Sequence, residues 1–185
     1  MAQLRMTLLG GFQARSGTGE ILSVPSRKAQ ALLAFLALPV GRAHPRDKLA
    51  ALLWGDCSDQ QARQSLRQAL ALLRKELGPS RLFTADTQIV RLDPGLWSID
   101  ARDFEALARS QKAEDLSAAA RLFAGDFLSG VNIDEEAFEE WLSGQRTRLQ
   151  LAAGQLCETF VKRPDLVIDA DQALSAVEQL MALDP

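Results

Sequence analysis

In the sequence DQQARQSLRQALALLRKEL, residues 59–77, the apolar positions recur with the period of a half-buried helix. Its opposite side carries Arg, Gln and Lys, with no carboxylate between Gln60 and Lys75. These side chains bind phosphates and recognise base edges, so we interpret residues 59–77 as the recognition helix of a DNA-binding domain. The residues on the apolar side are Ala62, Leu66, Ala69, Leu70, Leu73 and Leu77.

Both ends of this helix are marked in the sequence. Ser58 and Gln61 have the spacing of a capping box, and Gly78-Pro79 ends the helix. At about 1.5 Å per residue the helix is roughly 28 Å long. That length is enough to cross a major groove and leave a buried side behind it.

The segments around this helix predict strands, two further helices and a hairpin. This order is that of a winged helix-turn-helix, in which the third helix enters the major groove and the hairpin contacts the flanking backbone. The predicted elements are a strand over residues 4–14 interrupted at Gly10-Gly11, a strand at 21–24, a helix over 27–38 capped by Ser26, a helix over 45–54 with Pro45 in its first turn, a hairpin over 82–92 and a strand at 96–99.

The two halves of the chain differ in charge. Residues 1–100 carry 13 Lys and Arg against 8 Asp and Glu, net +5, whereas residues 101–185 carry 8 against 16, net −8. This asymmetry suggests a basic module joined to an acidic one, and an acidic surface repels DNA. We therefore expect a winged-helix DNA-binding domain over residues 1–99 and a separate helical domain over residues 100–185.

From residue 100 the apolar pattern becomes helical throughout. Two short amphipathic helices precede a longer one that carries Phe138, Trp141 and Phe160, and a last helix is expected over residues 170–183. Alanine-rich helix pairs of this kind suggest helical-repeat packing. The sequence finishes in ALDP, as such a repeat ends, without a capping helix, so we expect these 185 residues to be the front of a longer protein.

Several motifs in order resemble the Streptomyces antibiotic regulatory protein family. The matching stretches are LRMTLLGGFQA, SRKAQALLAFLAL, PRDKLAALLWGD, QARQSLRQALALLRKELG, IDARDFEALA, LFAGDFLSGV and FEEWLSGQRTRL. The resemblance implies a winged helix of the response-regulator (OmpR) type joined to a bacterial transcriptional activator domain that is tetratricopeptide-like. It also implies sequence-specific DNA binding, often as a dimer, and recruitment of RNA polymerase. The wing, TADTQIVRL, departs from many relatives in lacking a glycine-rich tip.

The expected DNA contacts lie on residues 59–77 and on the wing. Arg67 is the strongest candidate, for a phosphate or for the N7 and O6 of a guanine, and Gln64 and Gln68 lie one turn apart, where each could contact an adenine. Arg63 and Arg74 each have the alternative of an intramolecular ion pair. The expected contact residues are Arg63, Gln64, Arg67, Gln68, Arg74, Lys75, Thr87, Gln88 and Arg91.

Other chemistry-bearing residues are assigned structural roles. We expect His44 at the surface or in a capping role, and the three tryptophans in the core rather than as platforms for bases. The acidic residues 135–140 are expected to form a solvated face rather than a metal site. Without a nucleophile-elbow, P-loop or zinc-protease motif, the sequence predicts no enzyme, no cofactor and no metal.

The sequence therefore predicts a cytoplasmic transcriptional regulator, an activator, that binds double-stranded DNA. Its two cysteines form no framework, and no apolar run is long enough for a signal peptide or membrane helix. The helical domain is expected to contact RNA polymerase or another partner, with a homodimer possible. The alternative is a winged helix that does not bind DNA and serves as an interaction or scaffold module in a larger multidomain signalling protein.

Overall fold

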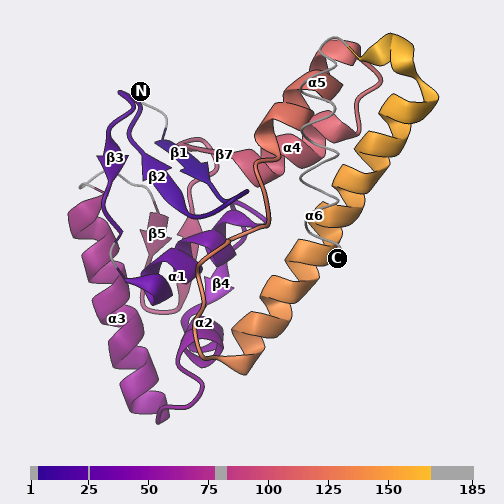
Figure 1. The fold of residues 1–185 in the computed structure, drawn as a ribbon. Coiled ribbons are helices and arrows are strands. Elements are labelled where there is room, and N and C mark those ends of the chain that lie inside the picture. Colours follow the sequence, from indigo (N-terminus) through magenta and orange to yellow (C-terminus); the bar gives the residue numbers. More distant parts are fainter. Residues whose placement is uncertain (1–3, 25, 78–82, 168–185) are drawn as a thin grey trace. The chain divides into compact units, whose positions relative to one another are not determined.

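The structure is a computed structural model that describes residues 4–24, 26–77 and 83–167 (Figure 1). The predicted helix at 170–183 and the predicted stop at Gly78-Pro79 lie outside the described residues. The chain forms two compact units, each built from three separate segments of the sequence. Unit 1 comprises Met1–Met6, Gln13–Ser98 and Gly130–Trp141, and unit 2 comprises Thr7–Phe12, Ile99–Ser129 and Leu142–Pro185. The division into one domain over residues 1–99 and another over residues 100–185 stays a prediction.

A four-stranded sheet opens the chain, with the strand order β3-β2-β1-β7. The prediction of one strand interrupted at Gly10-Gly11 is wrong, because the chain forms two separate strands there. Both glycines have positive φ, 84° and 140°, a backbone conformation that turns the chain rather than extending it. The strands are β1 (Leu4–Thr7), β2 (Gln13–Arg15), β3 (Ile21–Leu22) and β7 (Trp97–Ile99).

Three helices of unit 1 follow the predicted order. They are α1 (Arg27–Ala37), α2 (Arg46–Leu53) and α3 (Asp59–Glu76). The Ser26 hydroxyl accepts a hydrogen bond from the Ala29 amide, as expected of a cap at the start of α1. Pro45 lies one residue earlier than predicted, at the N-cap of α2. Most of α1 is buried, so this helix forms the centre of the unit 1 core.

The hairpin after α3 is formed by β5 (Phe83–Ala85) and β6 (Ile89–Leu92), which pair antiparallel as predicted. A third strand, β4 (His44–Pro45), pairs with the other edge of β6, so that His44 lies opposite Val90. The hairpin is therefore anchored to the segment that immediately precedes α2.

The prediction that His44 has a surface or capping role is wrong. Its side chain is buried and makes an edge contact with Phe35, with ring centroids 5.0 Å apart. Burial, with the nearby charge of Arg42, lowers the pKa of the imidazole below 6.5, because both disfavour the protonated form. The two-residue strand β4 carries the ring inward, which local sequence does not reveal.

Unit 2 is largely helical in its described part. It contains α4 (Asp100–Ala108), α5 (Ala113–Leu122) and most of α6 (Glu136–Lys162), followed by the short η1 (Pro164–Leu166). Asp100 is buried at the start of α4, and its carboxylate accepts hydrogen bonds from the amides of Leu8, Leu9 and Ala101. This single side chain ties the segment Thr7–Phe12 to α4. None of the described helices has both the length and the apolar character needed to span a membrane.

Candidate nucleic-acid interface

Helix α3 is fixed on one side by burial and at its start by hydrogen bonds. The six residues predicted to face the core are all buried. The Ser58 hydroxyl accepts a hydrogen bond from the Gln61 amide, and the Gln61 side chain accepts one from the Ser58 amide, so the predicted capping box is present. The rotation of α3 about its axis is therefore set, and with it the face that meets solvent.

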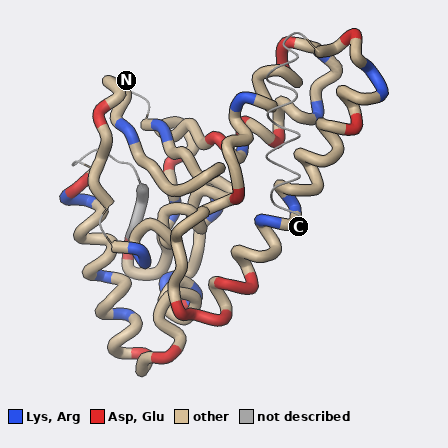
Figure 2. Tube along the Cα trace, in the orientation of Figure 1, with Lys and Arg blue, Asp and Glu red and all other residues tan. Residues whose placement is uncertain are grey.

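The exposed face of α3 carries amides and cations along its length. Arg63, Gln64, Arg67, Gln68 and Lys75 are all exposed. Arg74 is also exposed and has an interaction within the molecule. Figure 2 shows basic positions along α3. The carboxylates of this helix, Asp59 and Glu76, are its first and last residues. The predicted α3 residues are thus gathered on one surface.

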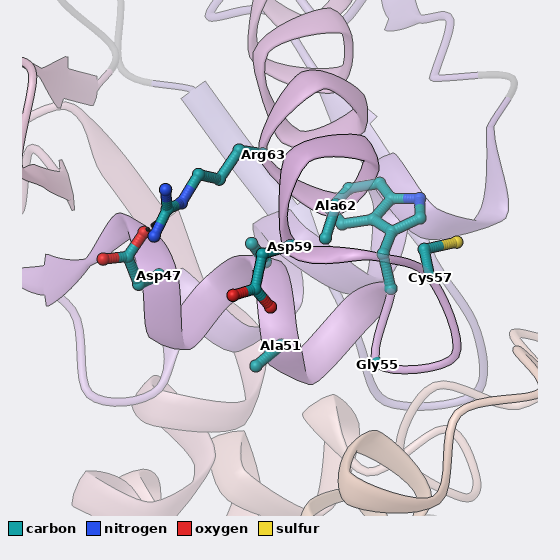
Figure 3. Close-up of a pocket in the computed structure, with 9 residues that line it drawn as sticks. Asp47, Ala51, Gly55, Cys57, Asp59, Ala62 and Arg63 are labelled. Carbon is teal, nitrogen blue, oxygen red and sulfur yellow. Dashed lines mark hydrogen bonds and ion pairs between the residues drawn. The ribbon is translucent and has the colours of Figure 1, made fainter.

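Arg63 makes an ion pair within unit 1. Its Nε lies 2.9 Å from Oδ1 of Asp47 on α2, an ion pair in which both side chains are more than half exposed. Figure 3 shows Arg63 reaching across from α3 to Asp47 at the edge of a cavity of about 130 Å³ between α2 and α3. The alternative considered for Arg63, an intramolecular pair, is the one found in the structure. An exposed pair of this kind contributes about 0–1 kcal/mol, so a phosphate can displace the carboxylate.

The tip of the hairpin is a tight turn closed by Asp86. Its carboxylate accepts hydrogen bonds from the amides of Gln88 and Ile89, and these bonds lower the pKa of Asp86. Arg46, at the start of α2, donates from its guanidinium to the Asp86 carbonyl and from its amide to the Gln88 carbonyl. The wing therefore needs no glycine at its tip, because a side-chain cap and an arginine from α2 hold the turn instead.

The three predicted wing residues, Thr87, Gln88 and Arg91, are all exposed but offer different contacts to DNA. Thr87 and Gln88 lie in the turn and Arg91 on β6, and all three side chains are exposed. Thr87 and Gln88 offer hydrogen-bonding groups, whereas Arg91 offers a charge for phosphate. Both α3 and the wing belong to unit 1, and Arg46 joins the wing to the helix that precedes α3.

The turn between α2 and α3 is held by a carboxylate from a distant part of the chain, Glu135, which the sequence did not predict as a partner of the turn. The Gly55 amide donates to Oε2 of Glu135 at 2.8 Å, and Oε1 of the same carboxylate lies 2.6 Å from Nζ of Lys28 on α1. The expectation that residues 135–140 form a solvated acidic face is wrong for Glu135, whose side chain is 5% exposed. The alternation of Val131, Ile133 and Glu135 with polar residues is the signal that could have indicated its inward position.

The tryptophans do not present platforms for bases. Trp54 and Trp97 are buried, as predicted. Trp141 is partly buried and lies against Phe35, with ring centroids 5.0 Å apart. In the parts of the chain that the structure describes, no group of acidic, histidine and cysteine residues has the arrangement of a metal site. The surface groups of unit 1 available for binding are therefore the cations and amides of α3 and the polar side chains of the hairpin, whose turn is held by hydrogen bonds.

Comparison with known proteins shows the fold. The chain aligns over its whole length with the structure of Mycobacterium tuberculosis EmbR in complex with a low-affinity phosphopeptide, with a TM-score of 0.61 and 20% sequence identity. The alignment covers 66% of the EmbR chain, so this chain spans somewhat less than two thirds of that protein. No family model and no curated protein sequence matched. A mixed β/α part followed by a helical part is thus an architecture that this chain shares with EmbR.

Proposed function

We propose that this protein is a sequence-specific DNA-binding transcriptional regulator of the Streptomyces antibiotic regulatory protein type. Helix α3 enters the major groove, and the wing contacts the flanking phosphates. The observation that carries this proposal is the exposed face of α3, where Arg67, Gln64 and Gln68 lie together without a carboxylate among them. The fold shared with EmbR, a regulator of that family, supports the class of protein.

The roles within the surface follow from side-chain chemistry. Gln64 and Gln68 are one turn apart and can form bidentate contacts with adenine, and Arg67 can contact a guanine or a phosphate. Arg63, Arg74, Lys75 and Arg91 are assigned to phosphates. Phosphate contacts set the register of the protein on DNA, whereas base contacts determine which sequence is preferred.

The helical part, residues 100–185, is proposed as the tetratricopeptide-like activator domain. In this role it contacts RNA polymerase or a second subunit, and the protein acts in the cytoplasm, where transcription takes place. A homodimer on two half-sites would double the number of base contacts. Each of these partners is testable by co-purification with purified polymerase and by light scattering of the chain on its DNA site.

The competing function is an interaction module that does not bind DNA. The observation in its favour is the overall charge, −3, which gives no general attraction to nucleic acid. Binding measured against salt separates the two functions. If the five cations of α3 and β6 meet phosphates, the affinity should fall with a log–log slope of about −4.5. A flat response would instead favour the interaction module.

The experiment begins with selection of duplexes from a randomised pool by the 185-residue chain. Fluorescence anisotropy then measures its affinity for the most enriched duplex and for a scrambled duplex of the same composition. Replacement of Arg67 by Ala should weaken binding to the selected duplex by roughly 5- to 150-fold, the effect of losing about 1–3 kcal/mol of recognition. The matched control is Arg102→Ala, which removes an exposed arginine from α4. Equal affinities of the two variants would refute the assignment of α3 to the groove.

A further inference from the structure

The segment that leads from the helical part into α6 belongs structurally to unit 1. We call residues 130–141 the strap. Val131, Ile133 and Glu135 are buried, whereas Asn132 and Asp134 between them are exposed. This period-2 pattern is that of an extended segment lying with one side against a core. Val131, Ile133 and Glu135 therefore face the core of unit 1, and the third of these inward positions carries a carboxylate.

A carboxylate at such a position is held by partners on two different elements. Oε1 of Glu135 pairs with Lys28 on α1, whose ammonium also lies 5.5 Å from the centroid of the Trp54 ring. Oε2 accepts the Gly55 amide, the first backbone group of the turn that leads into α3. Both carboxylate oxygens are thus used, and one of them restrains the backbone immediately before the proposed recognition helix.

The contact leaves little space at the turn. A Cβ atom placed on Gly55 would lie 2.9 Å from the Ala51 carbonyl and 3.4 Å from Oε2 of Glu135. The backbone of the turn therefore approaches the Ala51 carbonyl of α2 more closely than a side chain would allow, whereas the Glu135 carboxylate would be in ordinary contact with such a Cβ. Further along the strap, Phe138 is fully buried and contacts Trp141, which in turn contacts Phe35 on α1. Buried residues of the strap therefore lie on both sides of Glu135 in the sequence, Val131 and Ile133 before it and Phe138 after it.

The charge itself needs an explanation, because an apolar residue would occupy a buried position at lower cost. Buried ion pairs are often replaceable by hydrophobic residues without loss of stability, and their best-attested use is to fix one arrangement among several. Here the arrangement in question is that of the turn between α2 and α3. A hydrophobic residue at position 135 could fill the space but could not accept the Gly55 amide.

We propose that Glu135 is a positioning residue for DNA recognition, acting through Gly55 and Lys28 to fix the turn that sets the direction of α3. This inference rests on the proposed function and adds a means of regulation to it. Residues 123–129 join α5 to the strap, and α6 begins within the strap at Glu136, so a partner that pulls the strap away from unit 1 loosens the turn. The helical part can then change DNA recognition without contacting DNA.

The test compares specific with non-specific binding in the full 185-residue chain. The variants are Glu135→Leu, which removes the acceptor, Glu135→Gln, which keeps an acceptor oxygen but no charge, and Glu140→Gln as the control. Glu140 is an exposed acid of the same strap, so the control matches the change in net charge. Each variant is titrated with the selected duplex and with the scrambled duplex by fluorescence anisotropy.

Glu135→Leu should weaken binding to the selected duplex about tenfold or more, in the range of a mismatched base pair, and leave the scrambled duplex within about twofold. Non-specific binding depends on charge rather than on the direction of α3, so its salt slope should not change. Glu135→Gln should recover part of the specific affinity. A merely structural role would instead weaken both duplexes together, in step with loss of folded protein.

Hydrogen exchange on the free protein gives a second measurement. The amides from Gly55 to Ser58 should exchange at least tenfold faster in Glu135→Leu than in Glu140→Gln, while exchange in α1 is unchanged. Unchanged exchange at the turn, or an unchanged ratio of specific to non-specific affinity, would overturn the role of Glu135 while leaving DNA binding intact. Failure of the unaltered chain to prefer any duplex would overturn the proposed function and this inference with it.

Discussion

Replacement of Asp100 by Asn should change how the stability of this protein depends on pH. Burial raises the pKa of Asp100 from 3.8 to about 6, against the opposing effect of the hydrogen bonds that its carboxylate accepts from Leu9, Leu8 and Ala101. A difference of about two pKa units, at about 1.36 kcal/mol each, corresponds to roughly 3 kcal/mol. This is a large share of the stability of a typical domain, about 5–15 kcal/mol.

The sign of the effect follows from proton linkage. Because the pKa of Asp100 is higher in the folded than in the unfolded chain, the folded state holds the proton between about pH 4 and pH 6. The corresponding stability is fully present below pH 3.8 and is lost as the pH rises through about 6. Asn does not titrate, so the free energy of unfolding of Asp100→Asn relative to the unaltered protein should increase by about 2.5 kcal/mol from pH 4 to pH 7, the remainder of the effect lying below pH 4.

The measurement is urea unfolding at pH 4, 5, 6 and 7, followed by far-ultraviolet circular dichroism. The difference between the two proteins cancels every titrating group except Asp100. Tryptophan fluorescence provides a second probe, because Trp54, Trp97 and Trp141 all lie in unit 1 whereas Asp100 lies in unit 2. A difference that stays constant with pH would refute the argument. A difference that decreases with pH would mean that the three amide hydrogen bonds outweigh desolvation.

Two further predictions concern the turn before α3 and the strap. Gly55→Ala should lower the free energy of unfolding by about 1–3 kcal/mol, because its Cβ meets the Ala51 carbonyl, a backbone atom that cannot move aside. The control Gly144→Ala, whose Cβ meets nothing in the middle of α6, should raise it by up to about 1 kcal/mol; equal effects in thermal unfolding would argue against a tight turn. A fragment of residues 1–99 should unfold at a lower temperature than a fragment of residues 1–141, since it lacks the strap; equal melting temperatures would show that the first 99 residues fold alone.

Local signals in the sequence were sufficient for the proposed recognition helix. Ser58 and Gln61 form their capping box within a single turn, and the apolar side of residues 59–77 is the side that is buried. The hairpin at residues 83–92 was equally local, because both strands and the turn between them lie within ten residues. Such features depend on neighbours in the sequence, so a single chain reveals them.

Features set by distant partners could not be predicted. Glu135 contacts Lys28 across 107 residues and Gly55 across 80, and although its alternation with Val131 and Ile133 indicates an inward position, nothing local identifies these two partners. His44 is buried because its two-residue strand, β4, pairs with β6. Its partner in that pairing, Val90, lies 46 residues further along the chain. The turn at Gly10-Gly11 likewise depends on the position of β2 in the sheet, between β3 and β1. In each case tertiary contacts decide between conformations that the local sequence leaves open.

The strap also changes what the charge asymmetry of the chain means. Divided at residue 100, the sequence gives a basic half and an acidic half, but the compact units divide it differently. Unit 1 carries 13 Lys and Arg against 12 Asp and Glu, and five of those carboxylates are in the strap. The unit proposed to bind DNA is therefore close to neutral, so attraction has to come from the local face of α3 and the wing. At physiological salt, charges beyond about 8 Å are largely screened, which lets such a local face act while the net charge contributes little.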